Sequence, residues 1–169
     1  MRALLAVALA VAPCGAAFAQ HADPDQQRSP RINALEDASN DAAAECAEIN
    51  KDLHFSMEEM INKCQSEAAE VRAALAANPG ASGHSKNIAN VGLSYIEFTI
   101  AGDYVRADKV RSARACARAE AAWEATTRID VAASPKDWAS TFADIRESIS
   151  DTVRICRTDF GVPAGAPSL

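Results

Sequence analysis

Three side chains with soft donor atoms, His54, Met57 and Met60, recur at intervals of three residues. Imidazole nitrogen and thioether sulfur are ligands that suit copper. Residues three apart are neighbours on a helix surface, so the three side chains form a candidate copper site. The competing interpretation is core packing, because Met57 lies on the apolar stripe of the helix predicted there and Met60 lies beside it.

A second candidate site is a stripe of three arginines on one predicted helix: Arg111, Arg114 and Arg118. Guanidinium groups in a row can bind an anionic ligand or an acidic partner. An acidic stripe of matching pitch lies on the first predicted helix and comprises Asp37, Asp41, Glu45 and Glu48. The two stripes could therefore pair inside the protein, or each could simply face solvent.

The remaining histidines do not complete a known catalytic or metal motif. His21 and His84 lack the His or Glu partners that zinc and di-iron helices carry at fixed spacing. His84 and Ser85 are adjacent, but Ser–His catalysis needs a third group to orient the imidazole, and the sequence indicates none. We therefore predict a non-catalytic protein without a cofactor.

Residues 1–19 have the pattern of a secretory signal peptide: a basic start, an apolar run and a small-residue end at 17–19. We predict cleavage before Gln20. Cys14 loosely resembles the acylated cysteine of a lipoprotein, but the preceding Pro13 fits that motif poorly. The mature protein is predicted to be periplasmic or secreted. It has no predicted transmembrane segment, because no later apolar stretch approaches about 20 residues.

The mature chain keeps four cysteines, Cys46, Cys64, Cys116 and Cys156. An even number of cysteines in an oxidising compartment predicts two disulfides. No Cys-x-x-Cys pair is present, so thioredoxin-like redox centres, c-type haem attachment and zinc knuckles lack their sequence signature.

Apolar residues recur at alternating intervals of three and four, and no window alternates with a period of two. Ser29-Pro30 is typical of a helix start, and Ser56 with Glu59 forms a capping box at the start of a second helix. The predicted fold is all-α, a disulfide-stapled bundle of about five mostly antiparallel helices. A disordered lead at 20–29 and a disordered tail at 161–169 flank this bundle at 30–160.

The third predicted helix, over about 85–101, is apolar on nearly every side and is expected to be the central, most buried element. Gly102 is expected to end it, and Asp103 to cap a fourth helix that continues to about residue 129. A fifth helix is predicted to start at Ser134-Pro135.

The hairpin geometry predicts one disulfide. Cys46 and Cys64 stand nine residues before and nine after a turn near Phe55, so they should lie level across the hairpin. Cys116 and Cys156 then pair by elimination. Their positions around the last turn differ by about 15 Å along the helix axes, so a break in the fifth helix or a climbing loop must absorb the difference.

The last turn also has one tryptophan on each side, Trp123 and Trp138, at nearly equal distances along the chain. We therefore expect the two rings to pack together near the closed end of this hairpin. A platform on which a ligand stacks is the alternative interpretation of these aromatic residues.

The chain has 17 basic and 23 acidic residues, and removal of residues 1–19 changes its net charge from −6 to −7. This balance argues against a nucleic-acid partner. The hypothesis is an exported, periplasmic, non-catalytic helical protein that binds another envelope protein. The alternative is a small-ligand or copper carrier that uses the arginine stripe or the His-Met cluster. An exposed single-sign patch would favour the first, and an internal pocket with converging polar groups the second.

Overall fold

The computed structural model describes residues 30–52 and 54–160, with side chains from residue 34 onward. The predicted signal peptide, Cys14, the lead and the tail lie outside the described residues. The elements follow one another as α1 (Pro30–Ile49), α2 (Met57–Ala77), α3 (Gly83–Asp108), α4 (Ala113–Thr127), the short 3-10 helix η2 (Val131–Ala133) and α5 (Trp138–Phe160). No strand occurs in this described part, and none of its helices is long and apolar enough to cross a membrane.

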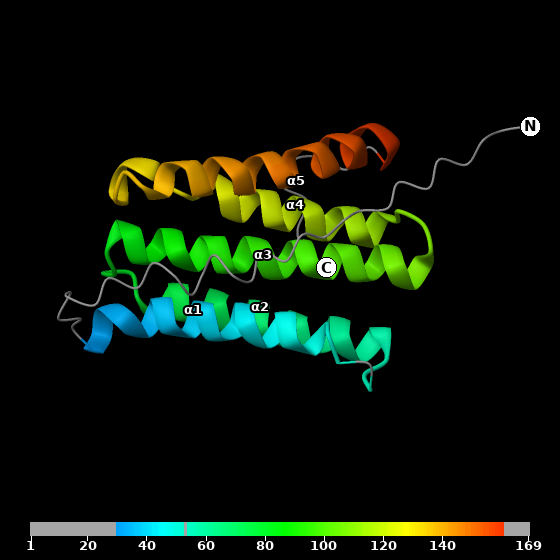
Figure 1. The fold of residues 1–169 in the computed structure, drawn as a ribbon, viewed down its shortest axis with the longest axis horizontal. Coiled ribbons are helices and arrows are strands. Elements are labelled where there is room, and N and C mark those ends of the chain that lie inside the picture. Colours follow the sequence, from blue (N-terminus) through cyan, green and yellow to red (C-terminus); the bar gives the residue numbers. More distant parts are fainter. Residues whose placement is uncertain (1–29, 53, 161–169) are drawn as a thin grey trace, which may run out of the picture.

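Two antiparallel helix pairs, α1–α2 and α4–α5, lie on opposite sides of α3 (Figure 1). Both α1 and α2 pack on α3, as does α4, whereas α5 packs mainly on α4. The predicted all-α bundle and the central position of the third helix are confirmed. Fourteen residues of α3 are buried, on all sides of the helix, so this element joins the two hairpins into one core.

Serine caps begin the internal helices. At α2 the predicted capping box is present: the Ser56 N–H donates to Glu59 Oε2 at 2.8 Å, and the Glu59 N–H donates to Ser56 Oγ at 3.3 Å. Ser82 caps α3 in the same way, and Ser112 caps α4. Each side chain satisfies an N–H group that has no partner within the helix.

The predicted helix end at Gly102 is wrong. α3 continues to Asp108, and Lys109, whose φ of 56° is left-handed, ends it. Asp103 is fully buried inside α3 instead of capping the next helix; it binds Arg106 and accepts a 3.2 Å hydrogen bond from Asn50 Nδ2. A glycine inside a helix costs only about 1 kcal/mol, which the bonds and packing of the following turn outweigh.

Both predicted disulfides are present. Cys46 and Cys64 join α1 to α2 with a Cα–Cα distance of 4.9 Å, and Cys116 and Cys156 join α4 to α5 at 5.4 Å. These distances are within the range that a disulfide tolerates. The prediction that Cys46 pairs with Cys64, which rested on their equal distances from the turn, is therefore confirmed.

The segment between α4 and α5, which we call the climbing connection, accounts for the unequal distances of Cys116 and Cys156 from the last turn. After α4 ends, residues 128–137 continue along the bundle toward the start of α3, so α5 begins well beyond the end of α4 (Figure 1). Ala133 sits so close to Gly83 that a Cβ on that glycine would lie 2.4 Å from the Ala133 Cβ. Asn87 holds the same connection, because its Oδ1 accepts the Asp130 N–H at 2.9 Å.

The climbing connection also separates the tryptophans, and the predicted packing of Trp123 against Trp138 is not observed. Trp138 packs beside Phe142, with ring centroids 5.8 Å apart, and edge-on to His84 at 5.4 Å. Trp123 instead belongs to a second apolar cluster, whose buried members come from α3, α4 and α5.

Candidate functional site

The three arginines predicted to share a stripe have three different acidic partners. Arg111 precedes α4, and its Nη1 lies 3.7 Å from Asp159 of α5. Arg114 binds Asp108 of α3, and its guanidinium lies 4.5 Å from the centroid of the Tyr104 ring. Arg118 enters the core and binds Glu97 of α3. These arginines therefore do not form one anion-binding surface.

The arginine stripe does not pair with the acidic stripe of α1, which was one of the two alternatives expected from the sequence. α3 lies between the two helices (Figure 1), so α1 and α4 cannot face each other. The acids of α1 point to solvent instead: Asp37, Asp41, Glu45 and Glu48 are all exposed. A periodic stripe defines the direction of side chains around one helix, but it does not identify the helix that they meet.

A buried carboxylate at the centre of the bundle links three helices. Glu97 of α3 has no exposed surface; it binds Arg72 of α2 and accepts hydrogen bonds from Arg118 Nη1 of α4 at 3.2 and 3.4 Å. A buried charge is costly unless it is paired, and here two guanidinium groups pair it. We interpret this group as a structural junction that the sequence pattern did not reveal.

Two further buried acids are paired in the same way. Glu120 of α4 accepts from Arg157 Nε and Nη2 of α5, at 2.6 and 2.8 Å. Asp103 lies beside the first disulfide, since Asn50 donates both to its carboxylate and to Cys64 Sγ. Burial raises the pKa of the Asp103 carboxyl, and the charge and hydrogen bond of Arg106 act in the opposite direction. These acids hold helices together and are not presented to a substrate.

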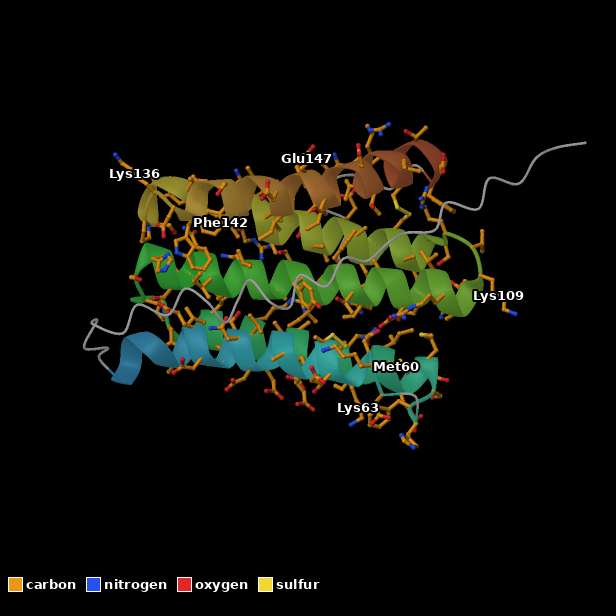
Figure 2. The ribbon with its side chains drawn as sticks, viewed as in Figure 1. Met60, Lys63, Lys109, Lys136, Phe142 and Glu147 are labelled. Carbon is orange, nitrogen blue, oxygen red and sulfur yellow. A yellow bond between two sulfur atoms is a disulfide. The ribbon has the colours of Figure 1, made fainter. Side chains whose placement is uncertain are left out.

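The predicted copper ligands differ in their exposure. The side chain of His54 is 95% exposed, and its Nδ1 lies 2.8 Å from Asp52 Oδ1. Met60, labelled in Figure 2, is buried in the first turn of α2, and Met57 is half-buried against the core of α1, α2 and α3. The described residues also contain no group of three His, Cys, Asp or Glu side chains that could hold a metal ion.

The structure pairs His84 with Ser134 and not with the adjacent Ser85. Its Nδ1 lies 3.0 Å from Ser134 Oγ, which also accepts a 2.8 Å hydrogen bond from Asn87 Nδ2. Within the described residues, we find no acid at the second ring nitrogen of His84, so the third member of a triad is missing. These bonds fasten the climbing connection to the first turns of α3.

The net charge is segregated between the α1–α2 hairpin and the rest of the described chain. Residues 30–77, the α1–α2 hairpin, contain ten acidic and four basic residues, a net charge of −6. Residues 78–160 contain eleven acidic and eleven basic residues and are neutral. Oxygen-tipped side chains line the outer edge of α1 in Figure 2. The excess charge of the protein therefore lies on one hairpin.

Acids of α1 and α2 lie close enough to influence one another. Burial raises the pKa of Glu67 on α2, and the charges of Glu70 and of Glu45 on α1 raise it further. We call six carboxylates of this hairpin the acidic face: Asp37, Asp41, Glu45, Glu48 and Glu70, which are exposed, and Glu67, which is half-buried. The spacing of acids along the sequence predicted only the α1 half of this face, although the charge of each predicted helix also indicates the α2 half.

The hollows on the surface of the described residues include one beside α1 and one beside α5. One, of about 350 Å³, is at the C-terminal end of α1 and is lined by acids that include Glu45 and Asp52, together with Phe55. The other, of about 440 Å³, lies between α4 and α5 and is lined by residues that include Trp123 and Arg157. Both are open to solvent, and neither is the internal pocket expected of a carrier that encloses its ligand.

Comparison of the chain with protein-family models, with curated proteins and with solved structures finds no match.

Proposed function

We propose that this protein is an exported helical binding module whose acidic face holds a basic surface of another envelope protein. The observation that carries the proposal is the segregation of charge: the α1–α2 hairpin has a net charge of −6, and residues 78–160 have none. A single-sign surface steers an oppositely charged partner and determines its orientation. The partner is therefore expected to contribute lysine and arginine side chains.

The interior supports a module that binds as a rigid body. The Cys46–Cys64 disulfide staples the acidic hairpin, and the Glu97 junction anchors α2 to α3. Rigid partners lose little conformational entropy when they associate. The sequence of residues 1–19 and the two disulfides support a location in the periplasm or outside the cell, where thiols are oxidised.

Charge-neutral variants test the proposal in a cross-linked capture experiment from native periplasm. The first variant combines Asp41→Asn, Glu45→Gln and Glu48→Gln on the acidic face. The matched control neutralises the same number of exposed acids at the other hairpin: Asp137→Asn, Asp144→Asn and Glu147→Gln. We expect the face variant to lose the captured partner and the control to retain it. Capture should also weaken as salt screens the charges.

The result that would refute the proposal is equal capture by both variants. Equal loss would mean that overall charge, and not this face, attracts the partner. Equal retention would mean that the acidic face makes no contact with the partner. Circular dichroism of both variants before capture checks that the bundle is intact.

A further inference from the structure

We propose that the groove between α4 and α5 binds a small aromatic carboxylate. The groove has a volume of about 440 Å³ and is lined by Trp123 of α4 and, among others, Val153, Arg154 and Arg157 of α5. A planar apolar group beside guanidinium donors is the chemistry that recognises a ring carrying one negative charge. This volume is at the small end of ligand sites, which matches a single ring.

The apolar side of the groove is an indole on a packed support. Trp123 is half-buried and rests on a cluster that includes Ala119, Ile149 and Val153, and the side chain of Val153 is almost fully buried. The indole is therefore held in place from behind while part of it remains accessible. An aromatic ligand can stack on it or meet its edge without a rearrangement of the core.

Arg157 is the oriented cation of the groove. Its Nε and Nη2 atoms bind the buried carboxylate of Glu120, and its side chain is still 39% exposed. A guanidinium has five N–H donors, so the Nη1 group remains for a ligand. Because Glu120 holds the guanidinium plane, little side-chain entropy is lost when a carboxylate arrives.

The guanidinium of Arg154 can exchange its present partner for the carboxylate of a ligand. It binds Asp151 one turn earlier on α5, at 3.0 Å, and both side chains are more than 70% exposed. Pairs of this kind contribute little, so an incoming carboxylate can displace Asp151. Asp151 therefore competes with the ligand. Glu120 neutralises Arg157, so Arg154, once displaced from Asp151, supplies one positive charge to the groove, which matches a single negative charge on the ligand and disfavours a polyanion.

Covalent and ionic links set the width of the groove. Cys116 and Cys156 join α4 to α5, and Glu120, one turn after Cys116, joins Arg157, the residue after Cys156. Both links stand beside the groove, since Arg157 directly follows Cys156. The site is preorganised in the oxidised protein, and it is independent of the acidic face on the other hairpin.

Titration of the oxidised, mature protein with phenylacetate tests this site, with phenylacetamide as the neutral isostere. The readouts are calorimetry and the indole N–H resonances of Trp123 and Trp138 in NMR spectra. We expect sub-millimolar binding of phenylacetate, a shift of the Trp123 resonance, and at least tenfold weaker binding of phenylacetamide. Arg154→Gln should weaken binding by about two- to fivefold, whereas Arg128→Gln, an exposed arginine at the end of α4, should not.

The Asp151→Asn variant gives the sharpest outcome. Removal of the competing carboxylate should tighten binding by about two- to fivefold, the range expected for an exposed pair. Trp123→Phe keeps a ring, and Trp123→Ala removes it, so binding should fall in that order. Failure of phenylacetate to saturate by about 10 mM would overturn the proposal. Equal binding of the amide, or weaker binding in Asp151→Asn, would overturn it as well.

Discussion

The Nη1 atom of Arg118 on α4 lies 3.2 Å from a carboxylate oxygen of Glu97 on α3, and Glu97 has no exposed surface. Arg72 of α2 binds the same carboxylate from the other side. One anion therefore connects the two hairpins through the central helix. It also explains why an arginine that seemed available for ligands from its spacing is part of the interior.

Removal of this anion should strongly destabilise the fold. In Glu97→Ala, two guanidinium groups lose their buried partner, and breaking a buried ion pair from one side costs about 3–5 kcal/mol. We expect a corresponding decrease in the free energy of unfolding, measured by urea denaturation of the oxidised protein. Glu70→Ala, an exposed glutamate of α2, is the matched control and should change little. Similar denaturation midpoints for the two variants would contradict the claim that the Glu97 ion pairs stabilise the fold.

Two glycines of α3 should respond in opposite directions to alanine. A Cβ at Gly92 would lie 2.1 Å from Ser39 Oγ, where α1 crosses α3, so Gly92→Ala is expected to cost about 1–3 kcal/mol. A Cβ at Gly102 meets nothing within 4 Å, so Gly102→Ala should stabilise the helix by up to about 1 kcal/mol. Thermal denaturation measures both effects. Destabilisation by Gly102→Ala would mean that the helix is broken there.

Asp108 should titrate well below an ordinary aspartate. Its hydrogen bonds from Arg114 and Ser112 lower its pKa to about 2. Because the folded pKa is depressed, the stabilisation is present above the unfolded pKa and is lost as the pH falls from about 4 to about 2. NMR titration of the side-chain carboxyl checks the value. Arg114→Gln should raise this pKa. Glu45→Gln on α1 should leave the pKa unchanged, because Glu45 and the Asp108–Arg114 pair lie on different sides of the bundle.

The His-Met trio is expected not to bind copper tightly. His54 faces solvent and Met60 is buried, so convergence of the donors requires Met60 to leave the core. Titration of the reduced metal, Cu(I), into the mature protein should show no sub-micromolar site that Met57→Ala weakens. A sub-micromolar site lost in both Met57→Ala and His54→Ala would restore the carrier hypothesis.

Local and hairpin-level features were predictable from the sequence alone, because they depend on residues close together in the chain. The capping box needs only Ser56 and Glu59, and the Cys46–Cys64 pairing follows from equal distances to one short turn. The apolar residues on nearly every side of α3 indicated its central position, because a helix that is apolar all round must be buried all round.

The tertiary structure decided whatever depended on a choice between distant partners. Gly102 signals a helix end locally, yet the burial of Asp103 with Asn50, a residue 53 positions away, carries α3 onward. Arg114 and Arg118 do lie one turn apart on α4, as their spacing predicted. The spacing cannot tell whether α1, α3 or α5 faces them. The separation of Trp123 from Trp138 likewise depends on how the connection docks against Gly83. Periodicity describes one helix at a time, whereas the assignment of partners is a competition among all helices for the same buried surface.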